Sequence, residues 1–303
     1  MENNYPFTEW PPLAVCGKKI SLSGGSIFFY DCNSSSNQTL VFVHGLGDEA
    51  DTWRRVIPLL SSRGYRCIAV DLPGFGRSEW HGRINVICHA KAVIKVMTEC
   101  GIGNPDANGV PSTAVLIGSS MGGCIAEYAA FMRPDLTHAL ILIGGCFPAA
   151  KSLNPGLLFL GLPFIGRVWY KGFRKNHERA WKSLYSYYHD LDAMSDEDKT
   201  FLRSRVIARV ESNNQERGYF ASLRSVISFF LFKKVSMSKK VRMFNGKIFL
   251  VWGEHDRAMP VETTAVIRKL RPDAPLKTVA GAGHLPHQEK PAECVEVILS
   301  FLE

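Results

Sequence analysis

Continuous apolar runs alternate along this chain with helical or turn-rich segments. Runs at 39–43, 66–70, 112–117, 139–143 and 247–252 hold β-branched and large aliphatic residues with little polar interruption. Such runs are typical of strands that are buried on both faces of a sheet. Because helical periodicity lies between them, the pattern predicts an α/β fold with a mostly parallel, doubly wound sheet. Functional groups are then expected at the carboxyl ends of the strands.

Local patterns predict the remaining elements. Two short strands, at 18–22 and 27–32, flank a Ser-Gly-Gly-Ser turn and predict an antiparallel hairpin. Helices are expected at 52–61, 84–100, 261–270 and 291–302, another directly after the turn at 118–122, and a short strand at 277–279.

The alternation of strands and helices stops between residues 147 and 241. This segment is basic, rich in aromatic residues and helical in tendency, and it contains no buried strand pattern. Ser195, which three acidic residues follow, is a typical helix N-cap. Because a strand pattern returns at 247–252, we interpret 147–241 as a helical cap inserted into one core, formed by 1–146 and 242–303.

Composition narrows the class of protein. The start of the chain lacks a basic stretch followed by an apolar run, so no signal peptide is predicted. No apolar stretch reaches the roughly 18 residues that a spanning helix requires. The eight cysteines form no C-x-x-C pair, which favours reduced thiols over disulfides or a metal site. We therefore expect a cytoplasmic protein with no metal.

The net charge of +8 is concentrated in the predicted cap, which holds 17 Lys and Arg against 8 Asp and Glu. A basic surface can attract nucleic acid, anionic lipid or acidic substrates, but a solvated helical face is the simpler interpretation. The chain has no recognised nucleic-acid motif, so no nucleic-acid partner is expected. The apolar run 157–165, beside Arg167, Lys171 and Arg174, could line an acyl pocket or make peripheral membrane contact. Packing inside the cap is the interpretation that we favour for this run.

The third apolar run leads into a Gly-Ser-Ser-Met-Gly turn at 118–122, which fits the G-x-S-x-G pattern of a nucleophile elbow. In such a turn, small residues let the chain bend sharply between a strand and a helix. Only Ser120 has glycines two residues before and after it, at Gly118 and Gly122, so it is the candidate nucleophile and Ser119 is a spacer. The motif alone is weak evidence, since any Gly/Ser-rich loop can match it.

A serine nucleophile needs a general base, and the base needs a carboxylate that fixes its tautomer. In elbow-type sites the chain order is serine, acid, histidine. Asp256, just past the run at 247–252, is the candidate acid, although a helix-capping role is the alternative and Glu254 and His255 lie nearby. The strand before it ends without an acidic residue. His284, on a glycine-containing loop, is the candidate base, with His287 as its competitor.

An oxyanion intermediate needs two backbone N–H donors aimed at one point. Met121, directly after the candidate nucleophile, is expected to supply one donor. Leu46, in the loop after the first buried strand, is expected to supply the other. In the same loop, His44 is expected to support the backbone rather than to carry protons, and Gly45 to allow the turn.

These motifs together resemble the α/β-hydrolase superfamily, in its capped branch of lipase-, esterase- and C–C-hydrolase-like enzymes. The matching stretches are 44–47, 71–78, 118–123, 253–256 and 283–284, in family order. The resemblance implies the α/β-hydrolase fold and a mechanism that needs no cofactor. Ser120 would attack a carbonyl with His284 as base, and water would release the acid. A serine at the elbow argues against epoxide hydrolases and haloalkane dehalogenases, which use a carboxylate there.

The predicted function is hydrolysis of carboxylic esters of apolar acyl substrates through an acyl-enzyme. Hydrolysis of a C–C bond in a vinylogous diketone, or acyl transfer, would use the same three residues. A third hypothesis is a non-catalytic protein of this fold that senses a small ligand.

Overall fold

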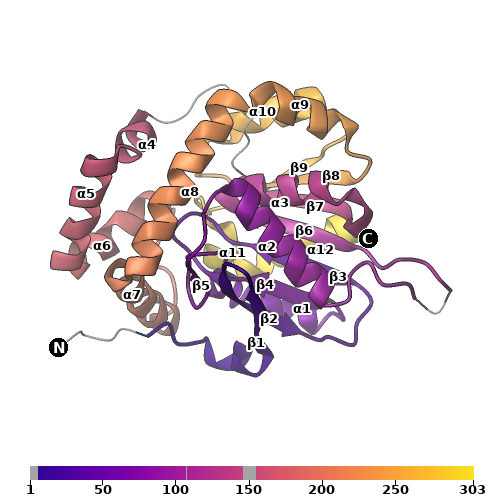
Figure 1. Cartoon of the computed structure of the whole chain (residues 1–303), viewed down its shortest axis with the longest axis horizontal. Coiled ribbons are helices and arrows are strands. Elements are labelled where there is room, and N and C mark those ends of the chain that lie inside the picture. Colours follow the sequence, from indigo (N-terminus) through magenta and orange to yellow (C-terminus); the bar gives the residue numbers. More distant parts are fainter. Residues whose placement is uncertain (1–5, 107, 146–154) are drawn as a thin grey trace.

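A single mixed sheet organises the chain in the computed structural model, which describes residues 6–106, 108–145 and 155–303 (Figure 1). Its nine strands are β1 (Gly17–Leu22), β2 (Gly25–Cys32), β3 (Thr39–Val43), β4 (Arg66–Val70), β5 (Glu79–Trp80), β6 (Ala114–Ser119), β7 (Thr137–Ile143), β8 (Lys247–Gly253) and β9 (Leu276–Val279). The strand order is β1-β2-β4-β3-β6-β7-β8-β9, with β5 beside β2. The pairs that β2 forms with β1, β4 and β5 are antiparallel. The other pairs, β4–β3, β3–β6, β6–β7, β7–β8 and β8–β9, are parallel. The predicted hairpin and mostly parallel sheet are therefore confirmed.

Helices connect these strands. They are α1 (Val56–Ser61), α2 (Val86–Glu99), α3 (Met121–Met132), α4 (Pro155–Leu160), α5 (Pro163–Lys175), α6 (His177–Lys182), α7 (Asp196–Glu211), α8 (Asn213–Phe232), α9 (Lys234–Met243), α10 (Ala265–Leu270), α11 (Pro286–Glu289) and α12 (Pro291–Leu302). Short 3-10 turns are η1 (Pro11–Cys16), η2 (Ala50–Trp53), η3 (Pro134–Leu136), η4 (Ser183–Ser186) and η5 (Val261–Thr264).

Both faces of the sheet are buried, which explains the uninterrupted apolar runs. In β3, Val41 and Val43 pack in the cluster that contains residues of α2 and α3. Leu40 and Phe42 point to the opposite face and pack with residues of α1 and α12. Since successive side chains of a strand alternate between faces, a strand covered on both sides must be apolar throughout.

Helices α4 to α9 lie between β7 and β8 in the sequence, where the cap was predicted. Residues of α5, α6 and α7 form a small apolar cluster of their own with Phe220 of α8. Figure 1 shows α4, α5 and α6 at one side of the molecule, with the long α8 running between them and the sheet. The far end of α8 and helix α9 pack instead into the sheet cluster, through Val226, Phe229 and Met237.

Two predicted helices are built differently from the expectation. The predicted helix at 52–61 is a 3-10 turn, η2, followed by the short helix α1. Pro58 explains the break, because one continuous helix over 52–61 would need a Pro58 N–H to bond the carbonyl of Arg54, and proline has none. In α1, Pro58 lies in the first turn, where no such bond is needed. The predicted helix at 261–270 likewise begins as the 3-10 turn η5.

The expectation that the apolar run 157–165 packs inside the cap is wrong for several of its side chains. Leu158, Phe159, Leu162 and Phe164 are all exposed. Burying this run would require a further layer against α4 and the start of α5, and the described residues supply none.

Among the described helices, none combines the length and the apolar character that a membrane span requires.

The predicted N-cap at the start of α7 can be tested through its contribution to the free energy of unfolding. The Ser195 hydroxyl accepts a hydrogen bond from the Asp198 N–H at 3.1 Å. Ser195→Ala should lower the free energy of unfolding by about 1 kcal/mol, because one helix N–H loses its acceptor. Urea denaturation would measure this, with Ser204→Ala in the exposed middle of α7 as the matched control. Equal stability of the two variants would contradict the capping role.

Candidate active site

The turn between β6 and α3 is a strained elbow centred on Ser120. Ser120 has φ 51° and ψ −122°, one of two non-glycine residues with positive φ in the described part of the chain. The helix starts against the end of β3, since a Cβ added to Gly122 would lie 2.1 Å from the Val43 carbonyl oxygen. A Cβ on Gly118 would likewise clash with the backbone of Gly122. The serine in the unusual conformation is thus Ser120, whereas Ser119 ends the strand.

Asp256 and His284, which are 28 residues apart in the sequence, are hydrogen-bonded. His284 Nδ1 lies 2.8 Å from Asp256 Oδ2, and both side chains are buried. The other oxygen of Asp256 accepts the N–H groups of Ala258 and Met259 at 2.9 and 2.8 Å. The carboxylate thus contacts both the imidazole and the turn at 256–259. It does not cap the helix near Val261, which was the alternative, because η5 follows Pro260 and has no side-chain cap. With Nδ1 donating to the carboxylate, Nε2 is left as an acceptor.

The end of β7 leaves room for this pair. Gly144 has φ +51°, and a Cβ there would lie 3.1 Å from His284 Nδ1 and 3.2 Å from Asp256 Oδ2. The sequence offered no acid at this strand end, and the structure gives the reason. The position packs directly against the pair and tolerates only glycine without displacement.

The competing residues lie elsewhere. His287 on α11 is buried against Trp53, and its Nε2 lies 2.9 Å from the Thr52 hydroxyl. Burial, followed by the charges of His284 and Arg54, lowers the pKa of His287 to about 3. Glu254 and His255 are the residues near Asp256 in the sequence. Glu254 accepts a hydrogen bond from the Gly281 N–H, and His255 stacks on His189.

The loop after β3 contacts the elbow. A Cβ on Gly45 would lie 3.2 Å from the Ser120 Cβ, so the two backbones approach closely. His44 is fully buried behind this contact: Nδ1 lies 2.8 Å from the Gly45 carbonyl oxygen, and Nε2 accepts the Leu72 N–H at 3.0 Å. Burial lowers the pKa of His44 and keeps the ring neutral. The contacts agree with the expected support of the loop.

One cavity of about 290 Å³ brings most of the candidate residues together. Ser120, His284, Leu46 and Met121 all line it. Apolar and aromatic side chains from the segment between β7 and β8 also line it: Trp169, Tyr170, Phe173, Leu184, Val206, Tyr219, Leu223 and Val226. Asp256 lies behind His284, outside the lining. The predicted nucleophile, base and oxyanion donors thus share one largely apolar space.

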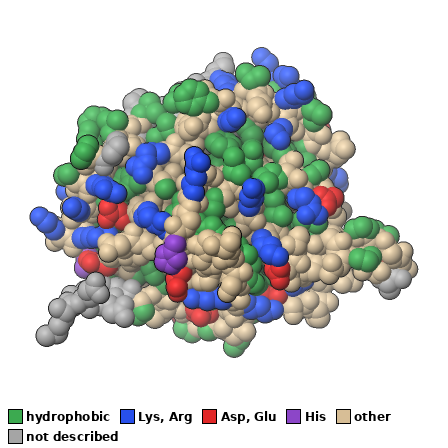
Figure 2. All heavy atoms as spheres, viewed as in Figure 1, with side chains coloured by type: hydrophobic (Ala, Val, Ile, Leu, Met, Phe, Trp, Pro, Cys, Tyr) green, Lys and Arg blue, Asp and Glu red, His purple; other side chains and the backbone are tan. Residues whose placement is uncertain are grey.

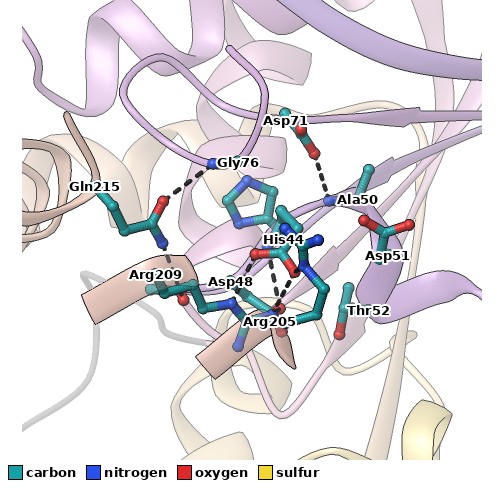
Figure 3. A network of polar contacts seen from close by, with 12 residues as sticks. His44, Asp48, Ala50, Asp51, Thr52, Asp71, Gly76, Arg205, Arg209 and Gln215 are labelled. Carbon is teal, nitrogen blue, oxygen red and sulfur yellow. Dashed lines mark hydrogen bonds and ion pairs between the residues drawn. The ribbon is translucent and has the colours of Figure 1, made fainter. Parts of the chain in front are cut away.

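A buried network of ion pairs and a hydrogen bond, which the sequence analysis did not predict, joins the loop after β3 to helices α7 and α8 (Figure 3). Glu49 accepts from Arg205 Nε at 3.2 Å and from Arg209 Nε at 2.7 Å, and Arg209 also pairs with Asp48. Gln215 donates to the Gly47 carbonyl at 3.2 Å. Arg205 and Arg209 are four residues apart on α7, so they share one face of the helix. That spacing is a signal that the sequence carried.

The two paired arginines lower the pKa of Glu49. Burial acts to raise its pKa, but Arg209 and Arg205 outweigh burial, and the pKa of Glu49 falls to about 2. A carboxyl whose pKa is depressed in the folded state stabilises the fold above its unfolded pKa, and this contribution is lost as pH falls through the folded pKa.

Replacing this carboxylate should therefore have a pH-dependent effect. Glu49→Gln should lower the free energy of unfolding by about 3 kcal/mol near pH 7, because buried Arg205 loses its charge partner and Arg209 keeps only Asp48. The difference from wild type should shrink as pH falls from about 5 toward 2, where wild-type Glu49 also becomes neutral. Urea denaturation at a series of pH values would measure it. Glu79→Gln, at an exposed pair with Lys19, is the control and should change little. A gap that stays constant with pH would contradict this assignment.

The described residues include no group of three or more His, Cys, Asp or Glu that could hold a metal ion.

A family model described as alpha/beta hydrolase fold matches residues 38–291. The chain is 27% identical to YugF, an uncharacterised hydrolase from Bacillus subtilis, over 94% of this chain and 97% of that one. It is 25% identical to a pimeloyl-[acyl-carrier protein] methyl ester esterase from Yersinia pestis, over 91% and 97%. A 2-hydroxy-6-oxononadienedioate/2-hydroxy-6-oxononatrienedioate hydrolase from Burkholderia vietnamiensis is 24% identical, over 90% of each chain. Since the family match covers most of its length, the chain belongs to the α/β-hydrolase fold family and is a hydrolase of that family.

Proposed function

We propose that this hydrolase cleaves carboxylic esters of apolar acyl groups by a Ser–His–Asp mechanism. The observation that carries the proposal is the meeting of Ser120, at its strained turn, with the hydrogen-bonded His284–Asp256 pair at one apolar cavity. A strained conformation held by close packing is typical of functional residues.

In this mechanism, the Ser120 hydroxyl attacks the ester carbonyl while His284 Nε2 takes its proton. Asp256 holds the imidazole in the required tautomer and stabilises its charged form. The N–H groups of Leu46 and Met121 stabilise the oxyanion. Met121 opens α3, where helix N–H groups have no partner within the helix and the helix dipole favours negative charge. Protonated His284 then releases the alcohol, and a water that His284 activates hydrolyses the acyl-enzyme.

The charge in the cavity favours uncharged substrates. Among the described residues that line it, Arg209 is the only Lys or Arg, and it is already paired with Asp48 and Glu49. A substrate carboxylate would compete with two protein carboxylates for this cation. The Burkholderia relative is named for dicarboxylate substrates. C–C hydrolysis of such a substrate, or acyl transfer, uses the same residues and is the alternative, and a non-catalytic ligand sensor is the third candidate.

The proposal needs no cofactor, because the serine, the histidine, the carboxylate and water supply every step. We also retain residues 147–241 as the cap of a core formed by 1–146 and 242–303. A cytoplasmic location is consistent with the free thiols of Cys16, Cys32, Cys67, Cys88, Cys100 and Cys294.

The nucleophile can be tested with p-nitrophenyl esters from acetate to palmitate. Ser120→Ala should lower kcat by roughly 10⁴-fold or more, because no acyl-enzyme can form. Ser119→Ala is the matched control: this neighbouring hydroxyl is buried without a hydrogen-bond partner among the described residues, so its loss should leave most of the activity. Similar rates for wild type and Ser120→Ala would overturn the proposal.

The preference for uncharged acyl groups can be tested with two esters of equal length. We expect p-nitrophenyl butyrate to have a kcat/KM at least about tenfold above that of the mono-p-nitrophenyl ester of succinate, whose free carboxylate must be buried beside Asp48. Steady-state rates at one ionic strength would give the ratio. Preference for the succinate ester would instead favour the dicarboxylate alternative.

A further inference from the structure

Acidic residues are absent from two long stretches of the chain. All eight Asp and Glu residues between 147 and 241 lie within 178–216, and neither 136–177 nor 217–253 contains one. Helices α4, α5 and α9, and α8 beyond Glu216, therefore carry no negative side chain. The charge of the cap is segregated along the chain rather than mixed.

These acid-free helices lie next to one another. Gly166 of α5 packs so closely on α8 that an added Cβ would lie 2.4 Å from the Phe220 ring. At the other end of α5, Arg174 pairs with Glu216 of α8 at 2.9 Å. The two helices are thus antiparallel neighbours, and α9 continues directly from α8.

The outer side of these helices exposes large apolar side chains beside cations. We call this surface the basic apolar face. Its exposed apolar residues are Leu158, Phe159, Leu162, Phe164, Val168, Leu231, Phe232 and Val235, and its exposed cations are Arg167, Lys171, Arg224, Lys233, Lys234 and Lys239. Phe164, Phe232 and Val235 are 85%, 78% and 84% exposed. Figure 2 shows apolar and basic side chains interspersed over the upper part of the molecule, whereas acidic side chains lie mainly in its lower half.

The cations of this face are poorly neutralised. Arg167 lies 4.0 Å from Glu216, but Arg174 holds that carboxylate at 2.9 Å. Burial, followed by the charge of Arg167, lowers the pKa of Arg224. Like charges held together favour an anionic partner, which would relieve their repulsion.

We propose that the basic apolar face docks on an anionic phospholipid surface. Phosphates alone would satisfy the cations but not the exposed phenylalanines, whereas a lipid interface accepts apolar side chains among its acyl chains and pairs Lys and Arg with headgroups. The opposite sides of the same helices line the cavity, through Trp169 and Phe173 of α5 and Leu223 of α8. Docking would therefore bring the cavity wall next to the bilayer. If the proposed ester hydrolysis is right, substrates dissolved in the membrane can be reached.

Vesicle co-sedimentation tests the docking without reference to catalysis. The full chain should bind vesicles of phosphatidylcholine with about 30% phosphatidylglycerol more tightly than pure phosphatidylcholine vesicles, by about tenfold at low salt. Salt near 1 M should weaken this binding. Lys233→Glu with Lys234→Glu, and separately Phe164→Ser with Phe232→Ser, should each reduce binding by about tenfold.

Matched controls change lysines and exposed apolar residues elsewhere. Lys91→Glu with Lys95→Glu alters the net charge equally on α2, and Val15→Ser with Val110→Ser removes exposed apolar groups outside the cap. Both should bind as wild type does. Equal binding to the two vesicle types, or an equal loss in controls and face variants, would overturn the docking proposal.

Hydrolysis of p-nitrophenyl acetate, a water-soluble ester, separates this proposal from the preceding one. All face variants should retain wild-type rates, which also shows that they fold. Vesicle binding without any ester hydrolysis would remove the proposed function and leave the docking. Ester hydrolysis without preferential binding to anionic vesicles would remove the docking proposal and leave the proposed function.

Discussion

The site depends on a close contact between backbones at the carboxyl edge of the sheet. The first turn of α3 sits against the end of β3, where Gly122 leaves no space for a side chain beside the Val43 carbonyl. To reach that contact from β6 the chain must turn within one residue, and Ser120 takes up the turn with φ 51°. The Ser120 N–H donates to the Ile143 carbonyl at 3.0 Å, which anchors the elbow to β7. The serine is therefore held by the sheet itself.

The same edge supports the histidine and the carboxylate. The Gly144 N–H donates to the Val251 carbonyl at 3.0 Å, so the end of β7 is bonded to β8, from which the loop with Asp256 leaves. His284 is fixed at two points, by Asp256 through its ring and by the Tyr187 carbonyl through its backbone N–H at 2.7 Å. The second contact comes from the segment 147–241, which we propose as the cap. The position of the proposed base thus depends on both parts of the molecule.

Electrostatic contacts tie the loop after β3 to helices α7 and α8. The proposed oxyanion donor Leu46 belongs to a loop whose next residues, Gly47 to Glu49, bond Gln215, Arg209 and Arg205 on α7 and α8. Buried charges are stabilising only when each keeps its partner, so this network strongly constrains how α7 can sit on the loop. The inner sides of α5 and α8 line an apolar cavity, and their outer sides carry cations that we assign to lipid.

Much of this arrangement is local, and the sequence by itself determined it. The uninterrupted apolar runs predicted the sheet because burial on both faces leaves no position for a polar side chain. The glycine spacing selected Ser120 over Ser119, and Ser195 marked the start of α7. Pro58 also carried a local signal, a missing N–H, that the prediction of one helix at 52–61 overlooked.

Tertiary structure decided what local patterns cannot encode. His284 and His287 are three residues apart and chemically alike, and only the packing sends one to Asp256 and buries the other beside Trp53. The run 157–165 is apolar enough for a core, yet its side chains Leu158, Phe159, Leu162 and Phe164 are exposed because no further layer among the described residues covers them. The pairing of Glu49 with Arg205 and Arg209 joins residues about 160 positions apart, a distance over which only the fold sets neighbours. Residue type and spacing thus defined the chemistry available, and long-range packing selected which residues meet.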